Sequence, residues 1–183
     1  MKHNFSDQPL NYDGSQLRPL FAYETFGLRG DSVVSFIGAC DVEKQHMLDG
    51  EDKFAGDQIK GSEMLHFIIE VFRPNLFAAV SFQRLVASLC GETLMQMSDQ
   101  PIRREGDDLF FGEGKLSISV ASVSSVSFMV HFAVNISNKG TPVKTASLED
   151  LKLSGKDVAE SLLQKISQEF SEIEDATKKV FPL

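Results

Sequence analysis

Five side chains between residues 115 and 135 are of types that can bind and activate a small anion. They comprise a cation, an imidazole, an amide and two hydroxyls: Lys115, His131, Asn135, Ser117 and Ser119. A lysine ammonium stabilises negative charge that develops on a carboxylate or phosphate during transfer, and histidine is the most frequent general acid or base. We therefore take Lys115 and His131 as candidate catalytic residues, and the other three as candidate ligand-binding residues.

Apolar and small or polar residues alternate through this segment, which predicts two β-strands. In the first strand Lys115, Ser117 and Ser119 alternate with Leu116, Ile118 and Val120; in the second, His131 and Asn135 share one face. Successive side chains of a strand point to opposite faces of the sheet. A hairpin that turns through residues 123–125, with Ser117 opposite His131, would therefore gather the five candidates on one polar face.

Each main candidate also has an ordinary structural explanation. Lys115 follows Gly112-Glu113-Gly114 and could be a solvated lysine at a turn. His131 lies in an apolar strand, where a histidine is commonly packed and hydrogen-bonded to a neighbour. Asn135 could bond the loop that follows its strand.

Two other groups of polar residues give weaker signals. They are His66 with Glu70, and Cys40 with Asp41, His46 and Asp49. The first pair lacks a third metal ligand, and nothing in the sequence fixes the geometry of the second group, so no metal site is assigned. A buried cysteine at a strand end is the alternative for Cys40. Asp41 is kept as a candidate ligand contact, as is Arg18, which could pair with a carboxylate.

These residues belong to what we expect to be a single α+β domain of residues 1–183, a size that one hydrophobic core can serve. Further strands are expected over 32–37 and 64–71, and helices over 17–26, 76–97 and 155–180. Because the strands at 64–71 and 126–136 each have one apolar face, we predict a mixed or antiparallel sheet with helices packed on that face. The polar segment 39–62 is expected to be a mobile border of the pocket.

The composition limits the partners. A net charge of −8 argues against nucleic acid and acidic membranes. No apolar run approaches the ~20 residues of a membrane helix, no signal-peptide pattern is seen, and only two cysteines are present. We therefore expect a cytoplasmic protein that binds a small molecule, with no membrane span. A homo-oligomer is compatible with the sequence.

Several short motifs resemble those of known proteins. Residues 12–17, Phe26-Gly27, Gly30-Asp31-Ser32, Gly38 and Cys40-Asp41-Val42 resemble the N-terminal signature of an uncharacterised prokaryotic family known as a domain of unknown function. That resemblance covers nearly the whole chain. It implies a fold similar to the catalytic domain of biotin and lipoate protein ligases, which is related to the core of class II aminoacyl-tRNA synthetases.

Two local matches to those enzymes concern the candidate site. The run Asp108-Leu109 through Gly112, Gly114, Lys115 and Leu116 is similar to a ligase motif in which the lysine holds the activated carboxylate. Residues 131–136 resemble the His/Asn strand of octanoyl transferases. The chain departs from these families in two ways: residues 30–38 lack the paired arginine and triple glycine of lipoate ligases, and no cysteine follows Cys90. A thioester mechanism is therefore unsupported.

Two functional hypotheses follow. In the first, the protein is a ligase or acyl transferase in which Lys115 clamps a small carboxylate or its adenylate, so that ATP or an acyl-adenylate is the implied cofactor. In the second, it is a non-catalytic ligand-binding or scaffold protein that has kept the fold and lost the chemistry, because fold does not determine function.

Overall fold

The main sheet of the protein is mixed and five-stranded. The computed structural model describes residues 1–56, 58–141 and 143–181. The strands lie in the order β1 (Lys2–Phe5), β2 (Ser32–Asp41), β3 (Lys60–Val71), β8 (Phe128–Asn135) and β7 (Ser117–Val123). The β1 strand runs parallel to β2, and the other neighbours are antiparallel. The predicted α+β class with a mixed sheet is therefore confirmed.

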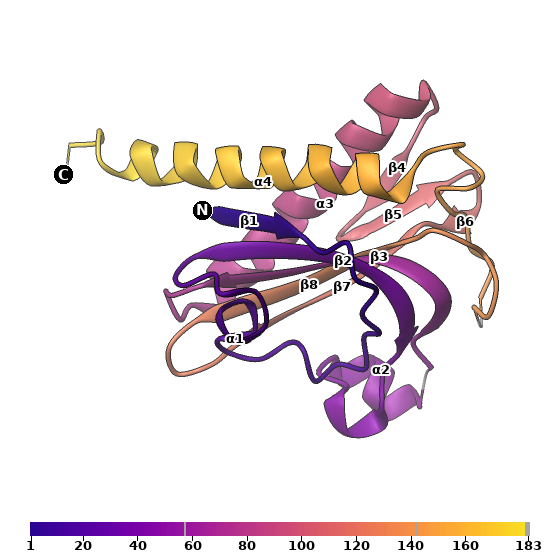
Figure 1. Cartoon of the computed structure of the whole chain (residues 1–183), viewed down its shortest axis with the longest axis horizontal. Helices are drawn as coiled ribbons and strands as arrows, with labels where there is room; N and C mark the ends of the chain where they lie inside the picture. Colours follow the sequence, from indigo (N-terminus) through magenta and orange to yellow (C-terminus); the bar gives the residue numbers. More distant parts are fainter. Residues whose placement is uncertain (57, 142, 182–183) are drawn as a thin grey trace.

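Two long helices cover one face of this sheet (Figure 1). They are α3 (Leu76–Ser98) and α4 (Gly155–Thr177). Each begins after a capping residue: Asn75 accepts a hydrogen bond from the backbone N–H of Ala78, and Ser154 accepts one from that of Asp157. Their apolar sides pack on the alternate residues of β3 and β8, which include Phe67 and Phe132. Both helices were predicted with nearly these bounds.

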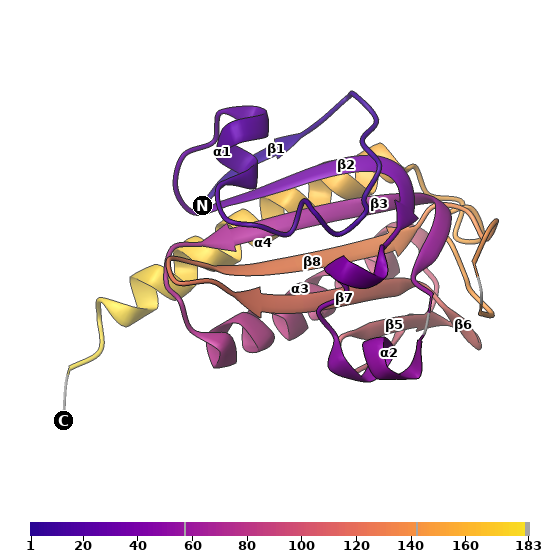
Figure 2. The ribbon, with the colours of Figure 1, turned by 90° about the horizontal axis from the view of Figure 1, so that it is seen from below.

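The opposite face of the sheet is also buried, which the sequence analysis did not expect. The short helix α1 (Phe21–Phe26) packs there, with Phe21 against Val34 and Phe36, and Figure 2 shows it across the sheet from α4. The prediction that this helix begins near residue 17 and joins the other two was wrong. Consecutive apolar residues in the central strands, such as Val33-Val34, need cover on both faces.

Glu70 fixes the start of α1 from within the sheet. Its carboxylate is 3% exposed and accepts hydrogen bonds from the backbone N–H of Leu20, at 2.9 and 3.1 Å, and from the Ser127 hydroxyl at 2.7 Å. Leu20 has a left-handed backbone (φ 66°), so the chain turns sharply there before it becomes helical. Glu70 thus connects α1 to the turn between β7 and β8.

We expect the substitution Glu70→Ala to destabilise the protein by about 2 kcal/mol, because it leaves the buried hydroxyl of Ser127 and the partly buried N–H of Leu20 without a partner. Urea unfolding monitored by circular dichroism would measure the change. Glu63→Ala, at an exposed position of the same strand, is the control and should change stability by less than about 0.5 kcal/mol. Equal effects of the two substitutions would contradict the structural role of Glu70.

The pairing of β7 with β8 differs from the predicted register. Ser117 lies opposite Val134, and Val120 lies opposite His131. Ser117 therefore shares the helix-covered face with Val134, while His131 lies on the other face with Val120. The expectation that Ser117 faces His131 on one polar surface was wrong.

The register differs because the hairpin turns through residues 124–127, where the N–H of Ser124 donates to the carbonyl of Ser127, and not through 123–125. A separate irregularity is that the first strand is interrupted at Leu116. Lys115 belongs to β6 (Gly114–Lys115), which forms a second small sheet with β5 (Asp108–Phe111) and β4 (Arg103–Glu105). The N–H of Leu116 donates to the carbonyl of Leu109 in that second sheet, and its own carbonyl accepts from Asn135 in the first. Leu116 therefore joins the two sheets, and the alternation of faces does not continue through it.

The polar segment after β2 contains more structure than expected. A 3₁₀ turn, η1 (Lys44–His46), is followed by α2 (Gly50–Ala55), which Asp49 caps by accepting from the N–H groups of Glu51 and Asp52. No residue of α2 is buried, and Phe54 is 93% exposed. The segment borders the cleft described below, as predicted; its mobility remains a prediction.

Candidate functional site

A cleft of about 530 Å³ opens at the edge of the main sheet, between β7, β6 and α2. Its walls include four carboxylates and two lysines: Asp49, Asp52, Asp107, Asp108, Lys60 and Lys115. Four of the predicted site residues also line it: Lys115, Ser117, Ser119 and Asn135. Four of the residues singled out from the sequence therefore lie in one cleft wall, although the predicted strand register was wrong.

Lys115 offers a partly exposed cation to the cleft. Its ammonium lies 2.8 Å from the carboxylate of Asp108, and the two side chains are 33% and 31% exposed. The backbone of Lys115 is held on both sides, because its N–H donates to the carbonyl of Lys144 and its carbonyl accepts from the N–H of Ala146. The side chain thus starts from a fixed position, and two of its three donors can serve other groups.

The two serines of β7 use their hydroxyls within the protein. Ser117 accepts a hydrogen bond from the backbone N–H of Leu109 at 2.9 Å. Ser119 donates to Asp107 at 2.7 Å and accepts from the side chain of Gln83 at 2.8 Å, and Gln83 also donates to Asp107. These hydrogen bonds join β7 to β5 and α3. Both serines therefore shape the cleft wall.

Asn135 joins three segments at the end of β8. Its side-chain amide donates to the carbonyl of Lys115 at 3.0 Å and to the carbonyl of Ala146 at 3.1 Å. The structural alternative considered for Asn135, a bond to a later loop, is thus present. The same contact holds the backbone of the candidate lysine, so Asn135 can influence the cleft through Lys115.

Arg18 and Asp41 line neither this cleft nor the small cavity described next. Arg18 pairs with Glu24 at 2.5 Å across the start of α1. Asp41 pairs with Lys60 at 3.3 Å, beyond a β-bulge between Gly38 and Cys40. Both carry exposed charges that these neighbours satisfy, so the structure does not bring them to the candidate site.

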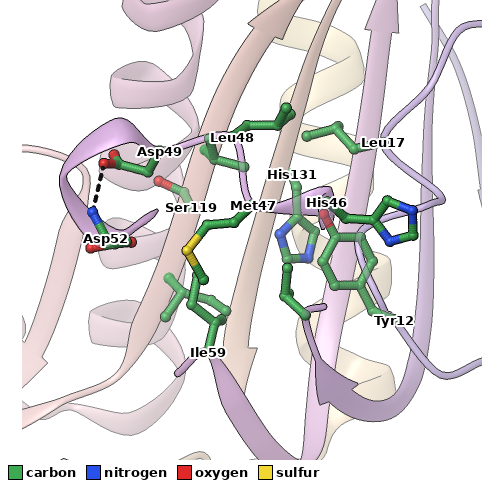
Figure 3. Close-up of a pocket in the computed structure, with 13 residues that line it drawn as sticks. Tyr12, Leu17, His46, Met47, Leu48, Asp49, Asp52, Ile59, Ser119 and His131 are labelled. Carbon is green, nitrogen blue, oxygen red and sulfur yellow. Dashed lines mark hydrogen bonds between the residues drawn. The ribbon is translucent and has the colours of Figure 1, made fainter. Parts of the chain in front are cut away.

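His131 lies in the wall of a smaller cavity that adjoins the cleft. This cavity has a volume of about 40 Å³ and shares Asp49, Asp52, Ile59, Ile118 and Ser119 with the cleft. The ring of His131 is 2% exposed and stacks on Tyr12, with 3.7 Å between ring centroids and 11° between planes. Figure 3 shows the two rings together at one side of the cavity.

A second histidine supports His131 from within the sheet. The Nδ1 atom of His66 lies 3.1 Å from Nε2 of His131. The Nε2 atom of His66 lies 3.3 Å from the carbonyl oxygen of Gly38. Burial lowers the pKa of His66 to about 4 and the pKa of His131 well below its usual 6.5. Both rings are therefore neutral at physiological pH.

The weaker predicted groups do not form sites. Glu70 and His66 have separate partners, as described above. Cys40 is buried beside Tyr12, and burial raises the pKa of its thiol to about 12, which disfavours a nucleophilic thiolate. Among the residues that the structure describes, no three His, Cys, Asp or Glu side chains are grouped so as to hold a metal ion.

No helix in the described ranges is long and apolar enough to cross a membrane.

Several residues of the site escaped the sequence analysis. They are Tyr12, Met47, Gln83 and Asp107. Tyr12 stacks on His131, and Met47 lines the small cavity. Gln83 and Asp107 hydrogen-bond to Ser119. Alternation patterns report which face a residue takes within its own strand, but they contain no information about which distant segment covers that face.

The fold belongs to a class with known ligand-binding members. A biotin protein ligase from Aquifex aeolicus in complex with biotin and ATP superposes with a TM-score of 0.62 at 14% identity, over 95% of this chain and 72% of that one. A T. acidophilum protein described as a candidate lipoate protein ligase, with lipoic acid bound, gives a TM-score of 0.56 at 14% identity, over 92% and 85%. At this identity the likeness establishes the fold, which is the one that the sequence motifs predicted.

The chain itself belongs to the family described as a domain of unknown function, DUF366, whose model matches residues 1–181. A protein of unknown function from Pyrococcus horikoshi has a TM-score of 0.95 and 33% identity, with all of both chains covered. An uncharacterised protein of Methanocaldococcus jannaschii is 29% identical over 185 residues, which cover 98% of this chain and 84% of that protein. The family membership predicted from the motifs is confirmed.

Proposed function

We propose that the cleft binds a small carboxylate or its adenylate, with the ammonium of Lys115 as the counter-charge. The observation that carries this proposal is the partly exposed Lys115–Asp108 pair in the cleft wall. Asp108 orients the ammonium, and the remaining donors can bind an oxygen of the ligand. The likeness of the fold to ligases that hold biotin or lipoic acid supports a ligand of this chemical class.

The charges of the cleft disfavour a ligand with several negative charges. Four carboxylates and two lysines line it, and Lys60 and Lys115 each pair with a carboxylate. Like charges repel strongly in a partly enclosed site. A monocarboxylate or a monoanionic acyl-adenylate therefore suits this charge balance better than a polyphosphate such as free ATP.

The second candidate function is binding without catalysis, and the internal hydrogen bonds favour it. Ser117, Ser119 and Asn135 use their polar groups to hold the cleft wall together. Both cysteines are buried, and burial raises the pKa of each thiol to about 12. These groups therefore serve poorly as nucleophiles. Release of pyrophosphate from ATP in the presence of a bound acid would favour the ligase function instead.

The cellular location and the partners of the protein are inferred from its composition. Two unpaired thiols are typical of a reducing compartment, and we infer a cytoplasmic location. The net charge of −8 disfavours nucleic acid as a partner. A small-molecule ligand remains the partner best matched by the cleft.

Lys115→Gln should weaken the binding of such a ligand roughly thirtyfold, because a charge-assisted bond of about 2 kcal/mol is lost. Isothermal calorimetry with octanoate, lipoate, biotin and their adenylates would measure the change. Lys144→Gln is the matched control, since Lys144 pairs with Glu113 at an exposed position and does not line the cleft. Equal affinities of the two variants, or no binding by the unmodified protein, would refute the proposal.

A further inference from the structure

The hydrogen bonds of the two buried histidines determine where their protons lie. The carbonyl of Gly38 can only accept, so Nε2 of His66 must carry a hydrogen. In a neutral ring Nδ1 of His66 is then an acceptor, and Nε2 of His131 must donate to it. It follows that Nδ1 of a neutral His131 has no hydrogen and presents a lone pair.

That lone pair has no partner among the residues that the structure describes. Within the described part of the chain, the polar contact of His131 is the one from its Nε2 to His66. Its Nδ1 is not fully enclosed by protein atoms, so a ligand can reach it. The ring as a whole is 98% buried but lines the small cavity. Figure 3 shows its ring beside that of Tyr12, with Met47 and Ile59 on the other side.

The rest of the cavity is largely apolar. The ring of Tyr12 and apolar side chains enclose most of it: Leu17, Val42, Met47, Leu48, Ile59, Ile118 and Val120. Four polar residues also line it: His46, Asp49, Asp52 and Ser119. A water needs roughly 10–15 Å³ of such volume, so about 40 Å³ accommodates a group of around three heavy atoms. An acceptor within mostly apolar walls selects a group that carries a hydrogen-bond donor, and a neutral group is favoured because a charged one would lose hydration there.

We propose that this cavity binds a neutral head group bearing an amide N–H or a hydroxyl, with Nδ1 of His131 as its acceptor. The inference extends the proposed function, because it assigns the opposite end of a ligand whose anionic end is held by Lys115 in the adjoining cleft. It makes His131 a residue that determines specificity. A ligand with a plain hydrocarbon end would leave the lone pair unpaired, and one with a charged end would lose its hydration in the apolar cavity.

The first test uses nuclear magnetic resonance and needs no anion. In protein labelled with ¹⁵N-histidine, the unprotonated nitrogen of His131 should be Nδ1. Acetamide should shift that resonance saturably, whereas acetone, which has a similar shape but no N–H, should not. Lys115→Gln should give the same response as the unmodified protein, because the cavity is a separate part of the site.

The second test compares two acids of equal length by calorimetry. A terminal hydroxyl makes 7-hydroxyheptanoate less hydrophobic than octanoate, so a purely apolar cavity would prefer octanoate. We expect 7-hydroxyheptanoate to bind at least tenfold more tightly instead. His131→Phe, which keeps a ring beside Tyr12, should abolish this preference. His46→Gln, at another residue lining the cavity, should preserve it.

The outcomes separate this inference from the proposed function. If both acids bind equally and Lys115→Gln weakens both, the donor head group is refuted and the anion site stands. If neither acid binds but acetamide shifts His131, the anion site is refuted and the cavity assignment stands. A protonated Nδ1, or a resonance that acetamide does not move, overturns the inference.

Discussion

Gly38→Ala should destabilise the protein by about 3 kcal/mol and disturb the candidate site at the same time. A Cβ atom at this position would lie 2.1 Å from the carbonyl oxygen of Leu10, closer than packed atoms approach. The backbone of Leu10 donates to Ile37, and that of Tyr12 donates to Ala39, so the N-terminal segment runs directly along β2. The added methyl must push this segment away, and overpacking of this kind costs about 1–3 kcal/mol or somewhat more.

Urea unfolding would measure the loss of stability, and the NMR signals of His66 and His131 would report the loss of the Tyr12 stack. Gly50→Ala is the matched control, because a Cβ there meets nothing closer than Phe54 at 4.0 Å. That variant should change stability by less than about 0.5 kcal/mol. If Gly38→Ala is as stable as this control, the close packing of the N-terminal segment on β2 is wrong.

Acidification should destabilise the protein through the buried histidines. The pKa of His66 falls from 6.5 to about 4 on folding, so between these values the unfolded chain binds more protons than the folded one. Stability is then fully present above pH 6.5 and is lost as the pH falls toward 4. At 1.36 kcal/mol per pKa unit, His66 alone accounts for about 3 kcal/mol. His131, whose pKa is lowered in the same direction, adds to the loss.

The measurement is the free energy of unfolding between pH 7 and pH 4.5. His66→Gln should be less stable at pH 7 but should show a shallower dependence on pH, since the titrating ring is gone. His3→Gln, which replaces an exposed histidine in β1, should retain the full dependence. A slope that is the same in all three proteins would show that carboxylates, and not the buried histidines, determine the response to acid.

The sequence predicted the elements that local signals determine. The helix over Leu76–Ser98 has a capping asparagine, and the one over Gly155–Thr177 has a capping serine and a strong apolar stripe. Such features depend on neighbours within a few residues. The family and the ligase-like fold were likewise predicted from short motifs around Gly38 and Lys115.

What the sequence did not predict depends on contacts between distant segments. The predicted register of β7 failed because the hairpin turns through residues 124–127 and not 123–125, and the turn decides which residues of the two strands face each other. The polar face expected around His131 is instead covered by Tyr12 and α1, which pack there from the N-terminal part of the chain. The wrong register placed Ser117 and Ser119 on the wrong side of the sheet, whereas Lys115 does lie in the cleft wall.

The pairing of β3 with β8 has a consequence for how the protein folds during synthesis. These strands lie side by side in the sheet, but α3 and the whole small sheet separate them in the chain. The ribosome must therefore release Asn135 before the sheet can close. It must release α4 later still before the apolar face of the sheet is covered. Until then the nascent chain exposes β3 and the apolar side of α3, which makes slow closure and transient protection by chaperones the expected course of its biogenesis.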